Sequence, residues 1–127
     1  MTELDQNKLT VQRFLDMAFN DKKPAEAFAA FVGPTYIQHN PHAPHGREAS
    51  LEFLSGFMAR FPQLTLDIKR AIAEGHLVVT HSLMKLSPED RGVAVADIVR
   101  IQDGKIVEHW DVAQEVPEAP ANDNTMF

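Results

Sequence analysis

Residues 93–112 read VAVADIVRIQDGKIVEHWDV, two apolar segments joined by the pair Asp103-Gly104. Segments rich in Val and Ile on either side of an Asp-Gly pair are typical of two antiparallel strands and a tight turn. Three carboxylates and a histidine interrupt the apolar pattern: Asp97, Glu108, Asp111 and His109. A carboxylate in an apolar strand is costly unless it has a partner or reaches water. The hairpin is therefore expected either to border a cavity, where the charges have a chemical task, or to expose them at a sheet edge.

The length of the turn decides which of these side chains share a face of the hairpin. A two-residue turn places Asp97 opposite Trp110. A three-residue turn, with Gly104 in the left-handed conformation, places Asp97 opposite His109. We favour the three-residue turn because it gives cross-strand pairs of complementary size and charge. It predicts that Asp97, His109 and Asp111 lie on one face, where a carboxylate and an imidazole can act together as general acid and base.

The first half of the chain predicts three helices. Apolar residues recur at helical spacing over residues 9–19, and Thr2 is a suitable N-terminal cap. Pro24 near its start and Gly33 just past its end favour a second, shorter helix. A third helix is predicted over residues 47–61 and ends before Pro62.

Strands are predicted after these helices, over residues 64–73, 76–86, 93–102 and 105–112. The short turns between them predict antiparallel neighbours. Three N-terminal helices packed on a curved antiparallel or mixed sheet make an α+β fold. Residues 1–116 are expected to form a single domain, and residues 117–127, which lack periodicity, a flexible C-terminal tail.

The composition of the chain limits the kinds of ligand and partner that it is expected to bind. The chain has 127 residues, no cysteine and a net charge of −6. Without cysteine there are no disulfides and no thiolate zinc sites. The basic residues are scattered, so neither nucleic acid nor an anionic membrane is expected as a partner. The polar, acidic start and the lack of a long apolar run predict a cytoplasmic protein with no membrane span.

A loop rich in histidine, YIQHNPHAPHGRE at residues 36–48, offers a second candidate site. Zinc bound by His39, His42 and His45 would require the three rings to converge on one point. The prolines in the loop prevent the helix that would bring them together, so a metal site here is the minor alternative. His42 and His45 are expected in solvent or at a pocket rim. His39 follows a short β-like segment and is expected to point into the fold.

His81 is a third candidate, on the predicted strand next to the hairpin. It shares a strand face with Val79 and Leu83. A lone histidine on an apolar face is more often a satisfied core residue than a catalyst, but its position beside the hairpin keeps it as a candidate catalytic residue.

The order of helices followed by a meander, the segment YIQHNP and above all DIVRIQDGKIVEHWDV resemble the SnoaL-like polyketide cyclases. These proteins belong to the nuclear-transport-factor-2-like superfamily, and the resemblance extends from about residue 5 to residue 115. It implies a cone-shaped α+β barrel around an apolar pocket, usually in a homodimer. It also implies ring closure by intramolecular aldol condensation without a metal or organic cofactor, with Asp111 as the acid/base residue.

The sequence departs from this family at one position. Fourteen residues before the aspartate the cyclases carry a histidine, whereas this chain has Asp97. Two nearby carboxyl groups do not readily ionise together, so one of them can stay protonated as a donor. His39 or His81 would then supply the missing imidazole. The superfamily also includes ketosteroid isomerases, epoxide hydrolases and dehydratases, so the fold alone does not choose the reaction.

Our first hypothesis is a small, cofactor-independent enzyme that acts on an apolar, carbonyl-bearing small molecule by aldol cyclisation, isomerisation or hydrolysis. Asp111 or Asp97 would remove a proton next to the carbonyl, and a histidine or protonated acid would donate to its oxygen. The candidate wall residues are Tyr36, Phe57, Phe61 and Trp110. The alternative is a non-catalytic module of the same fold that binds a ligand or serves as a dimeric scaffold.

Overall fold

The computed structural model describes residues 1–127 and contains three α-helices, the third of which follows the first strand. Helix α1 (Glu3–Leu15) starts with a capping box between Thr2 and Asp5 and continues into a π-helical turn, η1 (Asp16–Asn20). Helix α2 (Pro24–Phe31) has proline in its first turn, and α3 (Arg47–Arg60) follows the histidine-rich loop. All three predicted helices are present.

Five strands form one mixed sheet: β1 (Val32–Gln38), β2 (Thr65–Glu74), β3 (Leu77–Lys85), β4 (Val93–Gln102) and β5 (Lys105–Glu115). Their spatial order is β1-β5-β4-β3-β2, with β1 parallel to β5 and every other pair antiparallel. The predicted meander is confirmed for the last four strands. Strand β1 begins at Val32, directly after α2, so Gly33 lies within the strand.

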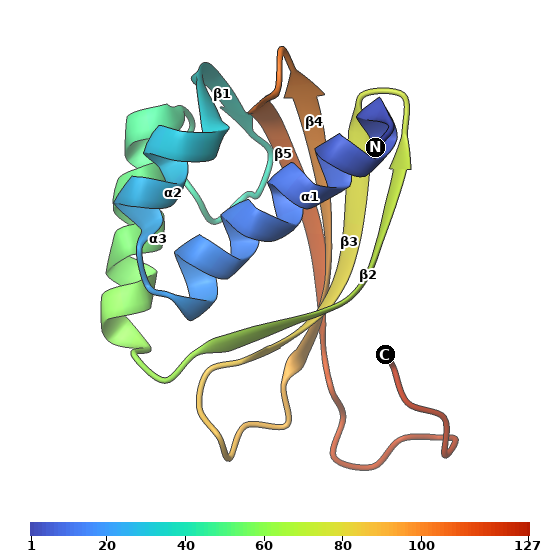
Figure 1. Cartoon of the computed structure of the whole chain (residues 1–127). Coiled ribbons are helices and arrows are strands. Elements are labelled where there is room, and N and C mark those ends of the chain that lie inside the picture. The colour runs from blue at the N-terminus through green and yellow to red at the C-terminus, as the bar shows by residue number, and fades with distance from the viewer.

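The helices lie together on one side of the curved sheet (Figure 1). The core between these layers is formed by apolar side chains from α1, α2 and the strands, among them Val11, Phe14, Phe28, Val78, Val99 and Ile106. The sheet is open, because β1 and β2 are its edges, and the helices cover one of its faces (Figure 1). The predicted α+β class, with helices packed on a curved mixed sheet, is confirmed.

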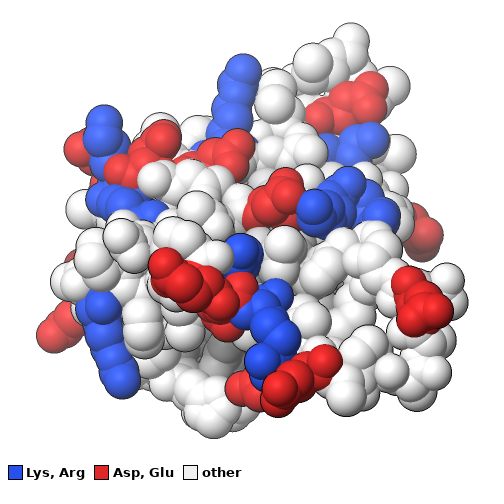
Figure 2. Space-filling model, turned by 90° about the horizontal axis from the view of Figure 1, so that it is seen from below, with Lys and Arg blue, Asp and Glu red and all other residues white.

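No helix or strand follows Glu115, and the last residues turn back below the sheet (Figure 1). The Phe127 ring stacks on the His81 ring, with 5.8 Å between the ring centroids. No helix combines the length and apolar character needed to cross a membrane. On the face seen in Figure 2, acidic and basic side chains are interspersed.

Candidate active site

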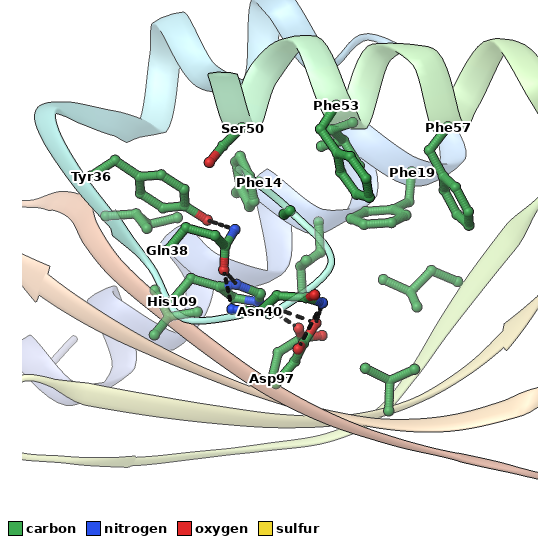
Figure 3. Close-up of a pocket in the computed structure, with 18 of the residues that line it drawn as sticks. Phe14, Phe19, Tyr36, Gln38, Asn40, Ser50, Phe53, Phe57, Asp97 and His109 are labelled. Atoms are coloured by element: carbon green, nitrogen blue, oxygen red, sulfur yellow. Dashed lines mark hydrogen bonds and ion pairs between the residues drawn. The ribbon is translucent and has the colours of Figure 1, made fainter. Parts of the chain in front are cut away.

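A cavity of about 250 Å³ lies between the helices and the inner face of the sheet. Apolar side chains make up 15 of its 21 lining residues, so it suits an apolar ligand. The polar lining residues are Gln38, Asn40, Ser50, Asp97, His109 and Asp111. Figure 3 shows Gln38, Asn40, Asp97 and His109 close together, whereas Phe19, Phe53 and Phe57 lie toward the other end of the cavity. The cavity therefore has one reactive end and one apolar end.

The β4–β5 hairpin brings the ionisable residues to this cavity by a register that the sequence analysis did not predict. The turn is a two-residue turn, since Gln102 pairs with Lys105, so the predicted three-residue turn is wrong. The register then shifts by one residue between Arg100 and Ile101, and beyond the shift Asp97 pairs with Asp111. A β-bulge of this kind reverses the alternation of side chains in one strand. The bulge therefore places Asp97, His109 and Asp111 on one face, as predicted, although through a different register.

His109 and Asp97 form the central pair of the site. Nε2 of His109 lies 2.8 Å from Oδ1 of Asp97 and 3.9 Å from Oδ2 of Asp111. Burial by itself lowers the pKa of His109, but the hydrogen bond and charge of Asp97, with the charge of Asp111, raise it above its ordinary value. The raised pKa favours the protonated imidazole, which can donate a proton.

Asp111 is in a different environment from Asp97. The side-chain amide of Asn40 lies 2.9 Å from both oxygens of the Asp111 carboxylate. The amide donates hydrogen bonds, which fix the orientation of the carboxylate beside the imidazole. The two carboxyl groups therefore have separate roles: Asp97 is paired with His109, and Asp111 is held by a neutral donor and borders the cavity.

Gln38 and Asn40 were missed by the sequence analysis. Oε1 of Gln38 lies 2.7 Å from Nδ1 of His109 and 3.0 Å from the backbone nitrogen of Asn40. Side chains two residues apart in a strand lie on the same face, and Tyr36 was already expected to line the pocket, so Gln38 could have been predicted to do the same. By that alternation Gln38 also faces inward. Asn40, in the loop after the strand, gave no comparable signal.

The Tyr36 hydroxyl stands at the same end of the cavity (Figure 3). Burial, and secondly the charge of Asp97, raise its pKa, so it stays protonated. Nε2 of Gln38 lies 3.5 Å from Tyr36 Oη, a long contact in which the tyrosine oxygen accepts. The hydroxyl proton is therefore available to a ligand in the cavity.

His39 and Trp110 lie on the opposite, outer face of the sheet. The expected inward orientation of His39 is wrong: its Nε2 lies 2.7 Å from Glu108 Oε2, and its ring stacks on Trp110 at 4.7 Å. Gln38 already faces inward, so alternation turns the next residue outward. Trp110 is likewise absent from the cavity wall, which corrects its expected role in substrate binding. Glu108 also accepts from Arg100 at 2.8 Å, and the hydrogen bond from His39, then that from Arg100, lowers its pKa.

His81 also lies outside the cavity. Its imidazole contacts Arg70 on β2 and the Phe127 ring, and it does not line the cavity. The neighbouring Thr80 and Ser82 are fully buried on the other face of the strand. A catalytic role for His81 is therefore not supported by its position, because alternation along β3 turns it away from Asp97.

The aromatic wall is partly as predicted. Phe57 lines the cavity from α3, together with Phe53. Phe61 does not line it; its ring packs edge-on against Phe57 at 5.0 Å, with the Arg60 guanidinium 5.1 Å from its centroid. Helix α3 ends at Arg60, so Phe61 lies beyond the helix and packs against Phe57 without lining the cavity.

One group of side chains is close enough together to bind a metal ion. The ligand atoms of Asp97, His109 and Asp111 all lie within 4.8 Å of one another. An ion there would have to displace the His109–Asp97 hydrogen bond and those from Asn40. The loop histidines form no such group, because His39 is paired with Glu108 while His42 and His45 are exposed.

Comparisons with known proteins agree with this architecture. The model of the SnoaL-like domain family matches residues 11–109. No curated protein matches significantly. A structure from Acidithiobacillus ferrooxidans, described as a polyketide cyclase, is 20% identical with a TM-score of 0.75, covering 89% of this chain and 91% of that one. A structure from Kribbella flavida, described as a ketosteroid isomerase, is 21% identical with a TM-score of 0.74, covering 96% and 87%.

A third similar structure is wild-type IdmH from Streptomyces antibioticus, described as a polyketide cyclase. It is 25% identical with a TM-score of 0.69, covering 85% of this chain and 91% of that one. Proteins described by different activities thus share this fold, so the likeness does not select a reaction. The family match extends over most of the chain, from the middle of α1 to His109 at the site, and the protein belongs to the SnoaL-like domain family.

Proposed function

We propose that this protein is a cofactor-independent acid/base enzyme that removes a proton next to a carbonyl group in an apolar small molecule. One observation carries the proposal. The Asp111 carboxylate and the hydrogen-bonded His109–Asp97 pair stand side by side at the polar end of a cavity that is otherwise apolar. Paired ionisable groups with separate environments are what general acid–base catalysis requires.

The proposed step uses Asp111 as the base. Its carboxylate takes the proton from the carbon next to the carbonyl, and the carbon–hydrogen electron pair becomes the double bond of an enol. The carbonyl oxygen receives a proton from His109 or a hydrogen bond from Tyr36. Return of a proton at another carbon gives isomerisation, and attack of the enol carbon on a second carbonyl gives an aldol ring closure. The apolar side chains of the cavity wall limit the contact of the enol with water.

The absence of Lys and Arg from the cavity lining supports a neutral substrate. Asp97 and Asp111 outnumber the one imidazolium, so a carboxylate or phosphate in this cavity would be repelled. We infer that the substrate is uncharged, with its carbonyl toward His109 and its apolar part toward Phe19, Phe53 and Phe57.

The test does not require the natural substrate. Uncharged mono- and bicyclic ketones are screened for binding by thermal stabilisation, and those that bind are incubated with the protein in deuterium oxide. We expect deuterium to enter next to the carbonyl faster than in buffer, as measured by mass spectrometry. Asp111→Asn should slow this exchange by about 10²–10⁴-fold, the usual contribution of a general base.

Asp103→Asn is the matched control, because Asp103 lies in the β4–β5 turn at a φ of 51°, a conformation that asparagine tolerates. It should exchange at the wild-type rate. Equal exchange in Asp111→Asn and wild type would refute the assignment of the base. Ligands that bind tightly but never exchange above the buffer rate would instead favour the non-catalytic binding module.

A further inference from the structure

We propose that Gln38 is a positioning residue that keeps a proton on Nδ1 of His109, so that the transferable proton of the site lies between Nε2 and Asp97. The catalytic consequence of this assignment rests on the proposed function. The proton assignment itself rests on the hydrogen bonds around Gln38 alone.

The orientation of the Gln38 amide is set by the backbone. The Asn40 backbone N–H lies 3.0 Å from Oε1 of Gln38 and can only donate. The atom at that position must therefore be the amide oxygen. The same oxygen lies 2.7 Å from Nδ1 of His109, and because an amide oxygen only accepts, Nδ1 must carry a hydrogen.

The second ring nitrogen has a different partner. Nε2 of His109 lies 2.8 Å from Oδ1 of Asp97. With Nδ1 protonated, the pair holds one further proton, either on Nε2 facing an ionised Asp97 or on Asp97 facing the bare nitrogen. Both arrangements make a good hydrogen bond, so the proton can move between the two atoms without loss of contact.

Once that proton is removed, neither tautomer of the imidazole satisfies both of its hydrogen-bond partners. If Nδ1 keeps its hydrogen, Nε2 and Oδ1 of Asp97 are two acceptors facing each other. If the hydrogen moves to Nε2, Nδ1 becomes an acceptor facing the Gln38 oxygen. Each tautomer contains one repulsive contact, so Gln38 makes the pair hold its proton more tightly than an Asp–His pair without this acceptor.

The other groups around His109 do not replace this effect. The titratable side chains that act on the imidazole are Asp97 on β4 and Asp111 on β5, and Tyr36 on β1 lines the same cavity. Helices α1 and α3 contribute apolar residues and Ser50 to the cavity wall, and no charged side chain. Gln38 is thus the neutral acceptor at Nδ1, and it distinguishes the two ring nitrogens.

Histidine NMR tests the assignment without any substrate. Correlation of ring protons with ¹⁵N shifts reports which nitrogen is protonated and the pKa of the ring. In the wild-type protein we expect His109 to be protonated on both nitrogens near neutral pH and to titrate above the ordinary histidine value of about 6.5. Below this titration, Nδ1 should carry a hydrogen whether the further proton lies on Nε2 or on Asp97. A wild-type His109 that carries its only hydrogen on Nε2 below this titration would overturn the proposal by itself.

Two variants of Gln38 sharpen the test. Gln38→Met has a similar length but no acceptor; the His109 pKa should fall by at least about one unit, and the neutral ring should carry its hydrogen on Nε2. Gln38→Glu keeps an acceptor oxygen and should restore Nδ1 protonation. Gln114→Met, at an exposed position of β5, is the control and should leave His109 unchanged. An unchanged His109 pKa and tautomer in Gln38→Met would refute the role of Gln38.

These outcomes are separate from those of the deuterium exchange. The NMR titration can succeed in a protein that catalyses nothing, and exchange by Asp111 can occur even if Gln38 has no effect on His109. If both hold, the upper pH limit of exchange in Gln38→Met should move down by the same number of pH units as its His109 titration.

Discussion

Asp97 and Asp111 are neighbours across two strands, yet their partners differ. Asp97 is nearly enclosed, at 7% exposure, and is bonded to His109, whereas Asp111 is held by the amide of Asn40. A carboxylate paired with an imidazolium is a poor base, because proton removal elsewhere would have to compete with that pair. The Asp111 carboxylate is held by a neutral amide and borders the cavity, so it can reach a ligand there. The residue partners therefore favour Asp111 as the base.

Thr80 is a buried residue whose hydroxyl group makes no hydrogen bond. Its hydroxyl is fully buried next to Asp97 in the sheet register and has no hydrogen-bond partner. An unpaired buried hydroxyl destabilises the folded state, and valine has nearly the same shape. Thr80→Val should raise the free energy of unfolding by about 1 kcal/mol in urea denaturation.

Thr65→Val is the comparison for this substitution, because Thr65 is exposed on β2. Its effect should stay within about 0.5 kcal/mol of zero. A clear loss of stability in Thr80→Val alone would mean that the hydroxyl has a partner, such as a bound water, that stabilises the sheet beside Asp97.

At the scale of elements, the site depends on where two strands leave regular pairing. The β-bulge in the β4–β5 hairpin turns His109 and Asp111 to the face of Asp97. Parallel pairing of β1 with β5, in which Gln38 lies beside His109, then brings Gln38 and Asn40 to the same place. Neither arrangement is a property of one element taken alone.

The start of β4 depends on Gly92. Its φ is +103°, and a Cβ there would overlap Leu83 Cδ1 and lie 3.2 Å from the Met84 carbonyl oxygen. Gly92→Ala should therefore lower the free energy of unfolding by about 1–3 kcal/mol, through backbone strain and the overlap. Thermal and urea unfolding measure the loss.

Gly56→Ala provides the opposite expectation in the same chain. Gly56 lies within α3, and a Cβ there meets no atom within 4 Å. Alanine at this position should stabilise the helix by roughly 0.5–1 kcal/mol. Equal effects of the two substitutions would contradict the view that Gly92 is required by its conformation.

At the scale of the whole molecule, the charges around His109 link stability to pH. Its pKa is raised in the folded state, so the folded protein binds more protons than the unfolded chain at pH values above the unfolded value, about 6.5. The stabilisation is complete below that value and is lost as pH rises through the folded pKa. The free energy of unfolding should fall over this range in wild type.

His109→Gln should remove this fall, while the other five of the six histidines remain. Urea denaturation at a series of pH values, followed by circular dichroism, gives the comparison. The same slope in wild type and His109→Gln would show that another group is responsible. The loss of the protonated donor also predicts that any exchange activity declines over the same pH range.

The outer face of the sheet suggests how the molecule associates. Ile72 and Val112 on this face are 62% and 70% exposed, and Leu77 is 41% exposed. Exposed apolar side chains on one face are typical of protein interfaces, and we expect a homodimer formed through it. Val112→Glu should convert the dimer to a folded monomer in sedimentation velocity experiments.

Ala29→Glu is the control, because Ala29 is exposed on α2, on the side of the helices. It should leave the sedimentation coefficient unchanged. A monomeric wild-type protein at tens of micromolar concentration would remove the homodimer expectation and leave the outer face without an assigned role.

Local patterns were sufficient to predict much of this protein. The α+β class, the three helices and the four strands of the meander follow from apolar periodicity, from Pro24 at a helix start and from turns such as Asp103-Gly104. These signals act over a few residues, so they can be read from the chain. The shared face of Asp97, His109 and Asp111 was also predicted, although through a different register.

The tertiary structure decided the rest. One additional residue in a bulge changes the register of every pair beyond it, and the turn sequence Asp103-Gly104 does not indicate where the bulge lies. The direction of His39 and the inward positions of Gln38 and Asn40 depend on how β1 docks beside β5, about 70 residues later in the sequence. The sequence determined which residues could perform acid–base chemistry, and only the long-range strand pairing decided which of them share the cavity.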